Sequence, residues 1–400
     1  MHNRLYKGLL VLLGCLICFS QMSARERPGP SIGKGCPTDC GQLLPHLEGA
    51  HYTEYVRSVK KEYQMNADGL VSLKNEHGKV QVLTWDRDRV KVDVKITIYA
   101  ASKSAADEVF SRVSINFDNS RENVAATTNV SKRDSWWDWM WNDVKDKYTI
   151  DYKVYVPRSA DLELNNSHGD VFVSELSGSA ELNVAHGDLT LDGVKEDLNL
   201  TFSYGTGVVH KSKDARVKVN FAKLRFKQAK DLQLTSSYSK IYIEQAADIL
   251  SESTYDTYEV GEVREFVNSG RCDDIAISYA DKVEVVSEIT DVKVEKVGRR
   301  ADLELLHGAA NIRSVAKGFS ELVLIGDFVD FTVAMEDGAT YKLAASANNA
   351  GITYPKELVI SSFKNSQKNN QEFEGYLGAT KNPKGLIKVK VSNGGCVIDK

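Results

Sequence analysis

The sequence predicts an all-β protein, a single parallel β-solenoid of about 18-residue coils with a small α+β cap near its N-terminus. Three observations predict this fold. Apolar residues recur with the coil period from Asp161 onward. Within each period they stand two residues apart, which places them on one face of a short strand. Glycine, aspartate or asparagine recurs at one fixed place, as in a turn. Units this short cannot bury a core alone, so they must stack and share one.

Each repeat can be numbered from one recurring, mostly apolar residue, here called the zero position. The zero positions are Leu164, Leu182, Leu200, Val219, Leu234, Ser251, Asn268, Val285, Leu303, Leu324 and Leu343. An apolar residue precedes each by two positions, and pairs such as Val171 and Val173 follow. Five positions after zero stand residues that tolerate positive φ, such as Gly169 and Gly187. The unequal steps between inward residues disfavour a hexapeptide-type acyltransferase helix.

The elements on either side of the repeats are assigned from shorter patterns. Residues 71–82 reproduce one coil, whereas residues 90–156 break the repeat. There we expect a strand over 90–98, a helix over 104–113 and a strand over 148–156, together an inserted cap. Polar residues 354–385 are expected to form a long loop. The predicted segments are a signal peptide (1–24), a leader (25–52), a first coil with the cap (53–157), the solenoid (158–353) and a polar loop with terminal strands (354–400).

Residues 1–24 have the organisation of a secretory signal peptide. Arg4 and Lys7 precede an apolar stretch over 9–19, and a short polar segment ends at Ala24. A lipoprotein signal ending at Cys15 is the alternative, but its apolar stretch would be too short. No later apolar run is long enough to cross a bilayer. We therefore expect an exported protein of the periplasm, the cell surface or the medium.

Four cysteines follow the predicted signal peptide. Cys36 and Cys40 lie in a Gly/Pro-rich leader and could close a small disulfide in an oxidising compartment. A zinc site there is disfavoured because no second Cys/His pair lies near. Cys396 occupies an inward position and is expected to be buried, while Cys272 stands in a turn and is expected to be a free thiol.

The charge balance excludes a nucleic-acid partner. The 400 residues include 51 basic and 55 acidic ones, which gives a formal net charge of −4. Binding to a phosphate backbone needs a clustered positive excess, which this chain lacks. Composition leaves protein and glycan partners open, and the oligomeric state as well.

Several strand and turn motifs resemble a known family. They are Gly69-Leu-Val-Ser-Leu73, Gly78-Lys-Val-Gln-Val82, Trp85-Asp86, Val154-Tyr-Val-Pro157, Leu162-Glu-Leu164 and Gly169-Asp-Val171. Together they resemble the adhesin-like cell-envelope proteins of Bacteroidetes, over about residues 53–400. The resemblance implies a single-chain β-helix of unknown function and brings no catalytic motif. The leader and the polar loop depart from the family pattern.

Four of the five tryptophans fall within six residues: Trp136, Trp137, Trp139 and Trp141. Their neighbours are polar or acidic, so some of the rings should face outward. Exposed indoles can stack on sugars or anchor a partner. The structural alternative is that the rings plug the end of the solenoid as its cap. Both interpretations stay open at this stage.

A second group of candidate residues lies four positions after zero, in one column along the turns. The column holds His77, His168, His186, Tyr204, Lys223, Tyr238, Tyr255, Cys272 and His307. Tyr204, Tyr238 and Tyr255 are expected to form an aromatic ladder, with a glycan groove as the alternative. His168 and His186, with Asp170 and Asp188, are weak candidates for a divalent metal. A solenoid aligns like residues whatever its function, so no cofactor or metal is predicted.

No constellation of catalytic residues is recognisable. The sequence has no Gly-x-Ser-x-Gly elbow, phosphate loop or paired acids in a recognisable arrangement. Acidic residues near the turns are there for conformational reasons as well. The sequence therefore predicts a non-catalytic, adhesin-like envelope protein that binds a glycan or an envelope protein. A purely structural or assembly protein is the second interpretation, and a β-helical polysaccharide-active enzyme the third.

Overall fold

A computed structural model describes residues 52–131, 147–367 and 370–400, all within the compact unit of residues 50–400. These residues form one helix and 24 strands of a single mixed sheet. Within the described ranges, no helix is long and apolar enough to span a membrane. The expected signal peptide, the expected lipid box at Cys15 and the Cys36–Cys40 pair lie outside the described residues.

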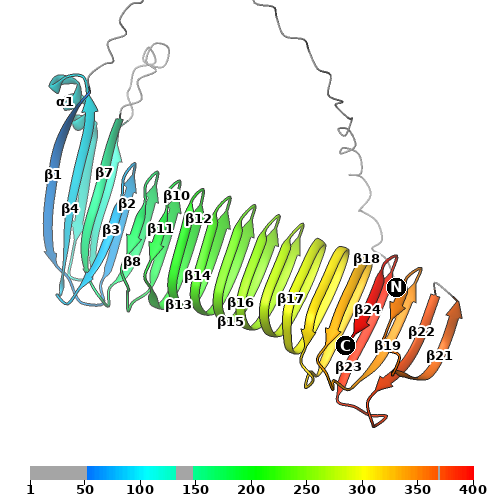
Figure 1. The fold of residues 1–400 in the computed structure, drawn as a ribbon. Coiled ribbons are helices and arrows are strands. Elements are labelled where there is room, and N and C mark those ends of the chain that lie inside the picture. The colour runs from blue at the N-terminus through cyan, green and yellow to red at the C-terminus, as the bar shows by residue number, and fades with distance from the viewer. Residues whose placement is uncertain (1–51, 132–146, 368–369) are drawn as a thin grey trace, which may run out of the picture. The chain divides into compact units, whose positions relative to one another are not determined.

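The elements follow each other along the chain with few long connections (Figure 1). The N-terminal ones are β1 (Thr53–Gln64), β2 (Leu70–Glu76), β3 (Val80–Trp85), β4 (Arg89–Ala100), α1 (Lys103–Arg112), β5 (Val113–Asn119), β6 (Asn123–Val130) and β7 (Lys147–Pro157). The middle ones are β8 (Asp161–Ser167), β9 (Val171–Val173), β10 (Ala180–Ala185), β11 (Leu189–Leu191), β12 (Val194–Ser203), β13 (Thr206–Asn220), β14 (Lys223–Ser237), β15 (Lys240–Thr254), β16 (Thr257–Arg271) and β17 (Asp274–Val315). The C-terminal ones are β18 (Glu321–Met335), β19 (Tyr341–Asn348), β20 (Gly351–Thr353), β21 (Val359–Gln367), β22 (Asn370–Leu377), β23 (Gly385–Ser392) and β24 (Gly395–Asp399).

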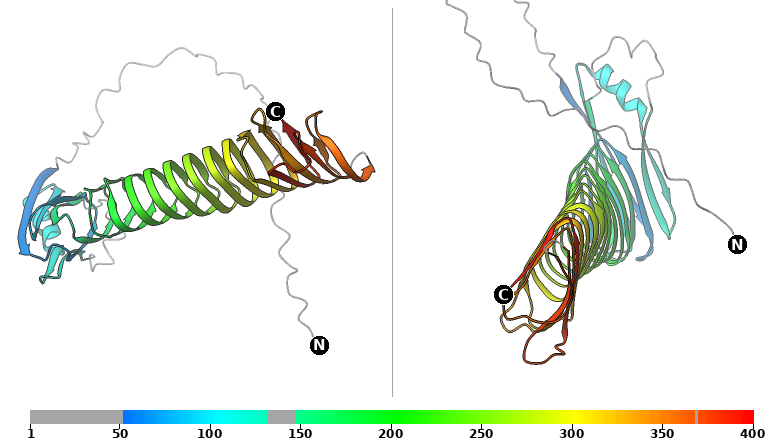
Figure 2. Two further views of the ribbon diagram at one scale, coloured as in Figure 1. Left: turned by 90° about the horizontal axis from the view of Figure 1, so that it is seen from below. Right: turned by 90° about the vertical axis from the view of Figure 1, so that its right-hand side faces the viewer.

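The middle strands pair in parallel, each repeat with the next. Leu164 lies beside Leu182 and Leu182 beside Leu200, so residue numbers rise by 18 from one repeat to the next. From Leu200 to Val217 the offset becomes 17 and stays so through β16 and the start of β17. Figure 2 shows these repeats one behind another. The predicted inward residues, Val171 and Val173 among them, are buried.

Two predicted zero positions are wrong by two residues. Register places Val217, not Val219, beside Leu200. Leu343 lies beside Ile387, as Leu322 does, so Leu343 corresponds to the residue two before zero. Both errors have the same cause, because alternate residues of a strand share one face and a shift by two keeps the apolar pattern.

Each repeat contains a turn, and the residue with positive φ in that turn is not the one that the sequence predicts. Positive φ belongs to the residue before the glycine, such as His168 at 58° and His186 at 55°. Gly187 is needed for space, because a Cβ there would overlap the carbonyl oxygen of Gly169. At Gly169 and Gly187 the successive turns therefore stack backbone on backbone.

Later repeats replace this glycine with residues whose side chains turn inward. Ser239, Asp256 and Asp273 are each at most 5% exposed. The backbone N–H of each repeat donates to the side chain of the next: Ser239 to Oδ1 of Asp256 at 2.7 Å, and Asp256 to Oδ1 of Asp273 at 2.9 Å. Buried polar groups of this kind need partners, and here the neighbouring repeat supplies them.

The strand expected over 90–98, the helix over 104–113 and the strand over 148–156 correspond to β4, α1 and β7. β4 pairs antiparallel with both β1 and β7. Helix α1 begins after Ser102, whose Oγ accepts a hydrogen bond from the N–H of Ala105 at 3.2 Å. β5 and β6 add a further antiparallel pair. The sheet is therefore mixed rather than purely parallel, with antiparallel pairs in the segment that was expected to break the repeat.

The C-terminal region contains a hairpin where a long loop was expected over residues 354–385. β21 and β22 pair antiparallel, and β22 pairs antiparallel with β19. Phe373 of β22 is 1% exposed, and its ring contacts those of Tyr354 and Phe363. The polar composition concealed this alternation, because the exposed residues of β22 are Asn370, Glu372 and Glu374.

Candidate functional site

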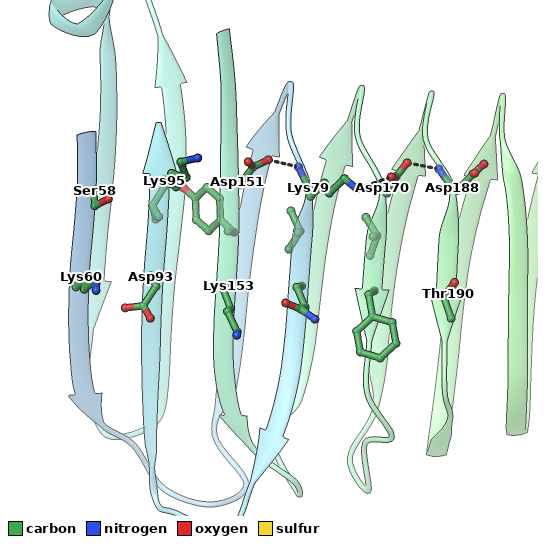
Figure 3. A pocket seen from close by; sticks show the side chains of 16 residues that line it. Ser58, Lys60, Lys79, Asp93, Lys95, Asp151, Lys153, Asp170, Asp188 and Thr190 are labelled. Carbon is green, nitrogen blue, oxygen red and sulfur yellow. Dashed lines mark hydrogen bonds and ion pairs between the residues drawn. The ribbon is translucent and has the colours of Figure 1, made fainter. Parts of the chain in front are cut away.

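A groove of about 760 Å³ lies on the outer face of the N-terminal strands. It crosses β1, β4, β7, β3, β9 and β11 in that spatial order (Figure 3). Its lining side chains fall in two rows, because strand register aligns one outward residue from each strand. The first row is Ser58, Lys95, Asp151, Lys79, Asp170 and Asp188, and the second is Lys60, Asp93, Lys153, Gln81, Phe172 and Thr190.

The carboxylates of the first row hold the strands together. Asp151 accepts a hydrogen bond from the N–H of Lys79 at 2.9 Å. Asp170 accepts from the N–H of Asp188 at 3.3 Å, and Asp188 accepts from the N–H of the following strand's first residue at 3.0 Å. Lys79 Nζ also lies 3.4 Å from Oδ2 of Asp170. This row is thus occupied by contacts within the protein.

The second row includes charged side chains that are free to bind a ligand. Asp93 pairs with Lys91 at 3.0 Å, and this contact raises the pKa of Lys91. On either side of Asp93 stand Lys60 and Lys153, which form no ion pair with any described residue. Lys153 Nζ lies 5.4 Å from the ring centre of Tyr155. Two ammonium groups are therefore available to a ligand's oxygen atoms.

Phe172 gives the second row an apolar surface. It alternates with buried Val171 and Val173, so its ring lies on the outer face of β9. Gln81 stands beside it on one side and Thr190 on the other. An aromatic ring between hydrogen-bonding side chains is the pattern by which pockets orient a ligand that has both polar and apolar faces.

The predicted tyrosine column exists as a ladder of stacked rings along the turns. Ring centres lie 4.6 Å apart between His186 and Tyr204, and 5.0 Å apart between Tyr238 and Tyr255. Phe221 fills the place predicted for Lys223, which lies two residues further on. Stacking covers the faces of most rings, so a sugar has little ring face left to stack on. We name these positive-φ residues, from His77 to Phe328, the turn ladder.

The candidate metal ligands do not converge. His168 and His186 stack with centres 4.8 Å apart and an angle of 12° between the rings. Desolvation, followed by the neighbouring histidines, lowers the pKa of His168. Asp170 and Asp188 are held in the first row of the groove. Among the described residues, no three His, Cys, Asp or Glu side chains are grouped to hold a metal ion.

The four clustered tryptophans, Trp136, Trp137, Trp139 and Trp141, lie outside the described residues. The fifth, Trp85, stacks on Tyr155 with ring centres 5.3 Å apart. Both cysteines within the described chain are free thiols. Cys396 is buried and Cys272 is partly exposed, as the sequence predicts.

Comparison with known proteins gives matches only among solved structures. No family model matches the chain. No curated protein matches it either. A candidate adhesin from Parabacteroides distasonis is 12% identical with a TM-score of 0.26, and covers 86% of this chain and 97% of its own. A second, from Parabacteroides merdae, is also 12% identical, with the same coverage and a TM-score of 0.24.

A candidate cell adhesion protein from Clostridium sporogenes is 8% identical, with a TM-score of 0.19, and covers 86% of this chain and 99% of its own. These three solved structures are described as adhesins or as a cell adhesion protein. At such low identities and TM-scores, these matches carry no argument about what this chain does.

Sequence reasoning missed the groove. Its rows combine residues far apart in the chain, such as Lys60 and Thr190, which only the strand register aligns. One signal was present, since Phe172 is a large apolar residue at an outward position between two inward valines.

Proposed function

We propose that this chain is a non-catalytic, adhesin-like binding protein of the bacterial cell envelope. Residues 158–353 would form a β-solenoid, with 53–157 as its first coil and cap. The regular parallel offset between repeats, with Leu164 beside Leu182 and Val217 beside Leu234, supports the solenoid. Residues 1–24 would export the chain to the periplasm, the cell surface or the medium.

The groove is the proposed ligand site, and a glycan the proposed ligand. The observation that carries this is the second row, where Phe172 lies beside Gln81 and Thr190, and Lys153 beyond Gln81. A sugar has an apolar face that packs on an aromatic ring and hydroxyls that need donors and acceptors at its edge. The row offers both over neighbouring strands.

The clustered tryptophans remain a second proposed binding surface. Trp136, Trp137, Trp139 and Trp141 carry the largest stacking area per residue that a chain can offer. Mutation of the tryptophans and mutation of the groove, made separately, distinguish binding by the tryptophans from binding by the groove.

A glycan array probed with the chain from Arg25 tests the proposal. We expect binding to be lost on Phe172→Ala and kept on Tyr242→Ala, which removes a ring from the same outward column beyond the groove. Loss in the four-Trp-to-Ala variant alone would assign binding to the tryptophans instead. Melting temperatures of all variants separate lost binding from lost folding.

The other two functions are outcomes of the same experiment. If the wild type binds no glycan on the array and no protein in envelope pull-downs, a purely structural or assembly protein is the remaining function. New reducing ends released from a bound polysaccharide would establish an enzyme and overturn the non-catalytic assignment.

A further inference from the structure

The turn ladder exposes a row of apolar side chains along one edge of the repeats. Tyr204, Phe221, Tyr238 and Tyr255 are each 50–53% exposed, and Ile289 is 52% exposed. The positive φ of these residues holds every side chain outward at the apex of its turn. A contiguous apolar row of this length is the kind of surface that contacts another protein.

The partner must match the spacing of the row. Neighbouring rings are about 5 Å apart, the distance between paired strands. A surface that contacts every ring in turn must therefore have a strand-spaced row of its own. A second copy of this chain has one.

Charges beside the ladder specify how two copies would face each other. Two residues after each ladder residue comes a second outward row, which reads Thr206, Lys223, Lys240, Thr257, Asp274, Asp291 and Ala309. Its charges run neutral, positive, positive, neutral, negative, negative and neutral. The four charged side chains form no ion pair with any described residue. Asp291 Oδ1 accepts a hydrogen bond from the N–H of Ala309 at 3.0 Å, and Lys223 Nζ lies 4.9 Å from the ring centre of Tyr242.

The charges of this row are complementary to the charges of the same row read in the opposite direction. A two-fold axis across the edge at Tyr255 and Thr257 would run the second copy antiparallel and keep the charged rows on the same side. Lys240 then faces Asp274 of the second copy, and Lys223 faces its Asp291. Each contact occurs twice.

The ladder itself fits the same axis. Tyr238 would face Cys272 of the second copy and Phe221 would face its Ile289, so the large rings oppose the two positions without a ring. Tyr255 would meet its own counterpart at the centre. We propose that this chain forms an antiparallel homodimer through the turn ladder, centred on Tyr255. The proposal is independent of the groove and its ligand.

The complementary contact between the two copies ends at Tyr204 and His307. One repeat beyond Tyr204 and His307, Asp188 would face Asp330 of the second copy, and two like charges would meet. An axis at Tyr204 would instead pair Lys240 with Asp170. That alternative is weaker because Asp170 already forms an ion pair with Lys79, whereas Asp274 and Asp291 form none with any described residue.

Two charge reversals test the dimer by sedimentation velocity on the chain from Arg25. Lys240→Glu alone would oppose Asp274, and Asp274→Lys alone would oppose Lys240. We expect each variant to raise the dimer dissociation constant roughly tenfold or more. An equimolar mixture should dimerise again. In the mixed pair the two substituted side chains face each other with opposite charges, and so do the two unchanged ones.

Lys227→Glu is the matched control, since Lys227 is exposed on the same strand as Lys223 but lies outside both rows. It should dimerise like the wild type, and circular dichroism should show that all variants fold. A monomeric wild type, dimerisation of either single variant at wild-type strength, or a mixture that stays monomeric would overturn the proposal. If a mixture of Lys240→Glu with Asp170→Lys dimerises, and a mixture of Lys240→Glu with Asp274→Lys does not, the axis at Tyr255 is wrong.

Discussion

The N–H of Asp256 donates a hydrogen bond of 2.9 Å to Oδ1 of Asp273, so two buried carboxyl groups lie one above the other in adjacent repeats. Each also accepts a serine hydroxyl at 2.7 Å, from Ser236 and Ser253 respectively. Neither forms an ion pair with a described residue. Carboxyl groups buried in this way favour the proton-bound state.

This pair predicts that the protein gains stability on mild acidification. Burial raises the pKa of Asp256 to about 6, and it raises that of Asp273 as well. Because the unfolded pKa is about 3.9, the folded state binds the extra proton between about pH 4 and pH 6. The contribution is full below the unfolded pKa and is lost as the pH rises through about 6. For Asp256 it amounts to at most about 3 kcal/mol.

Urea unfolding at about pH 5 and about pH 7.5 measures this contribution. The free energy of unfolding should rise on acidification in the wild type and rise less in Asp256→Asn, which cannot titrate there. Asp337→Asn, at an exposed site outside the turn ladder, is the control and should behave like the wild type. An equal pH dependence in all three proteins would contradict the prediction.

Gly187→Ala should destabilise the stacked turns. Its Cβ would overlap a backbone oxygen of the preceding repeat, which cannot move aside without shifting the whole turn. We expect a loss of about 2–3 kcal/mol, seen as a lower melting temperature. Gly318→Ala is the control, because nothing lies within 4 Å of a Cβ there. Equal melting temperatures for the two variants would refute the close-approach argument.

The two described thiols should differ in reactivity. Burial raises the pKa of Cys396 to about 12, and its side chain is 1% exposed, whereas Cys272 is partly exposed. Iodoacetamide requires the thiolate. Peptide mapping after native alkylation of the dilute, monomeric chain should therefore find Cys272 modified and Cys396 intact, with both modified after denaturation. Rapid native modification of Cys396 would show that the last repeat opens.

Phe373→Ala should loosen the C-terminal hairpin alone. The ring is buried between Tyr354 and Phe363, so its removal leaves β21 and β22 without their apolar anchor. Hydrogen exchange should accelerate over residues 359–377 and stay unchanged in β13 to β16. Phe363→Ala, at a 50% exposed site, should have a smaller effect. Acceleration throughout the repeats would mean that the hairpin is required to hold them.

The apolar columns were predictable because inward residues alternate within each strand and recur with each repeat. Val171, Leu189 and Ile241 are buried where the pattern places them. Register was harder to predict. The shortening of the repeat by one residue after Leu200 leaves the pattern intact, so Lys223 was mistaken for the ladder residue in place of Phe221.

The groove and the role of the glycines could not be predicted from the sequence, for a different reason. Both depend on which residues of distant segments lie side by side, such as Lys60 and Thr190, or Gly169 and Gly187. Local patterns carry no such information. The C-terminal hairpin was missed because its apolar side consists of a few residues around Phe373 within a polar segment.

The constant repeat length from β13 to the start of β17 has a consequence for how such a chain can change in length. Removing residues 223–239 would bring Thr206 beside Lys240 and leave every later column aligned. Removing one residue more or fewer would turn the outward side chains inward. Whole repeats can therefore be gained or lost as interchangeable parts, and the groove could be carried at different distances from the C-terminal hairpin without being rebuilt.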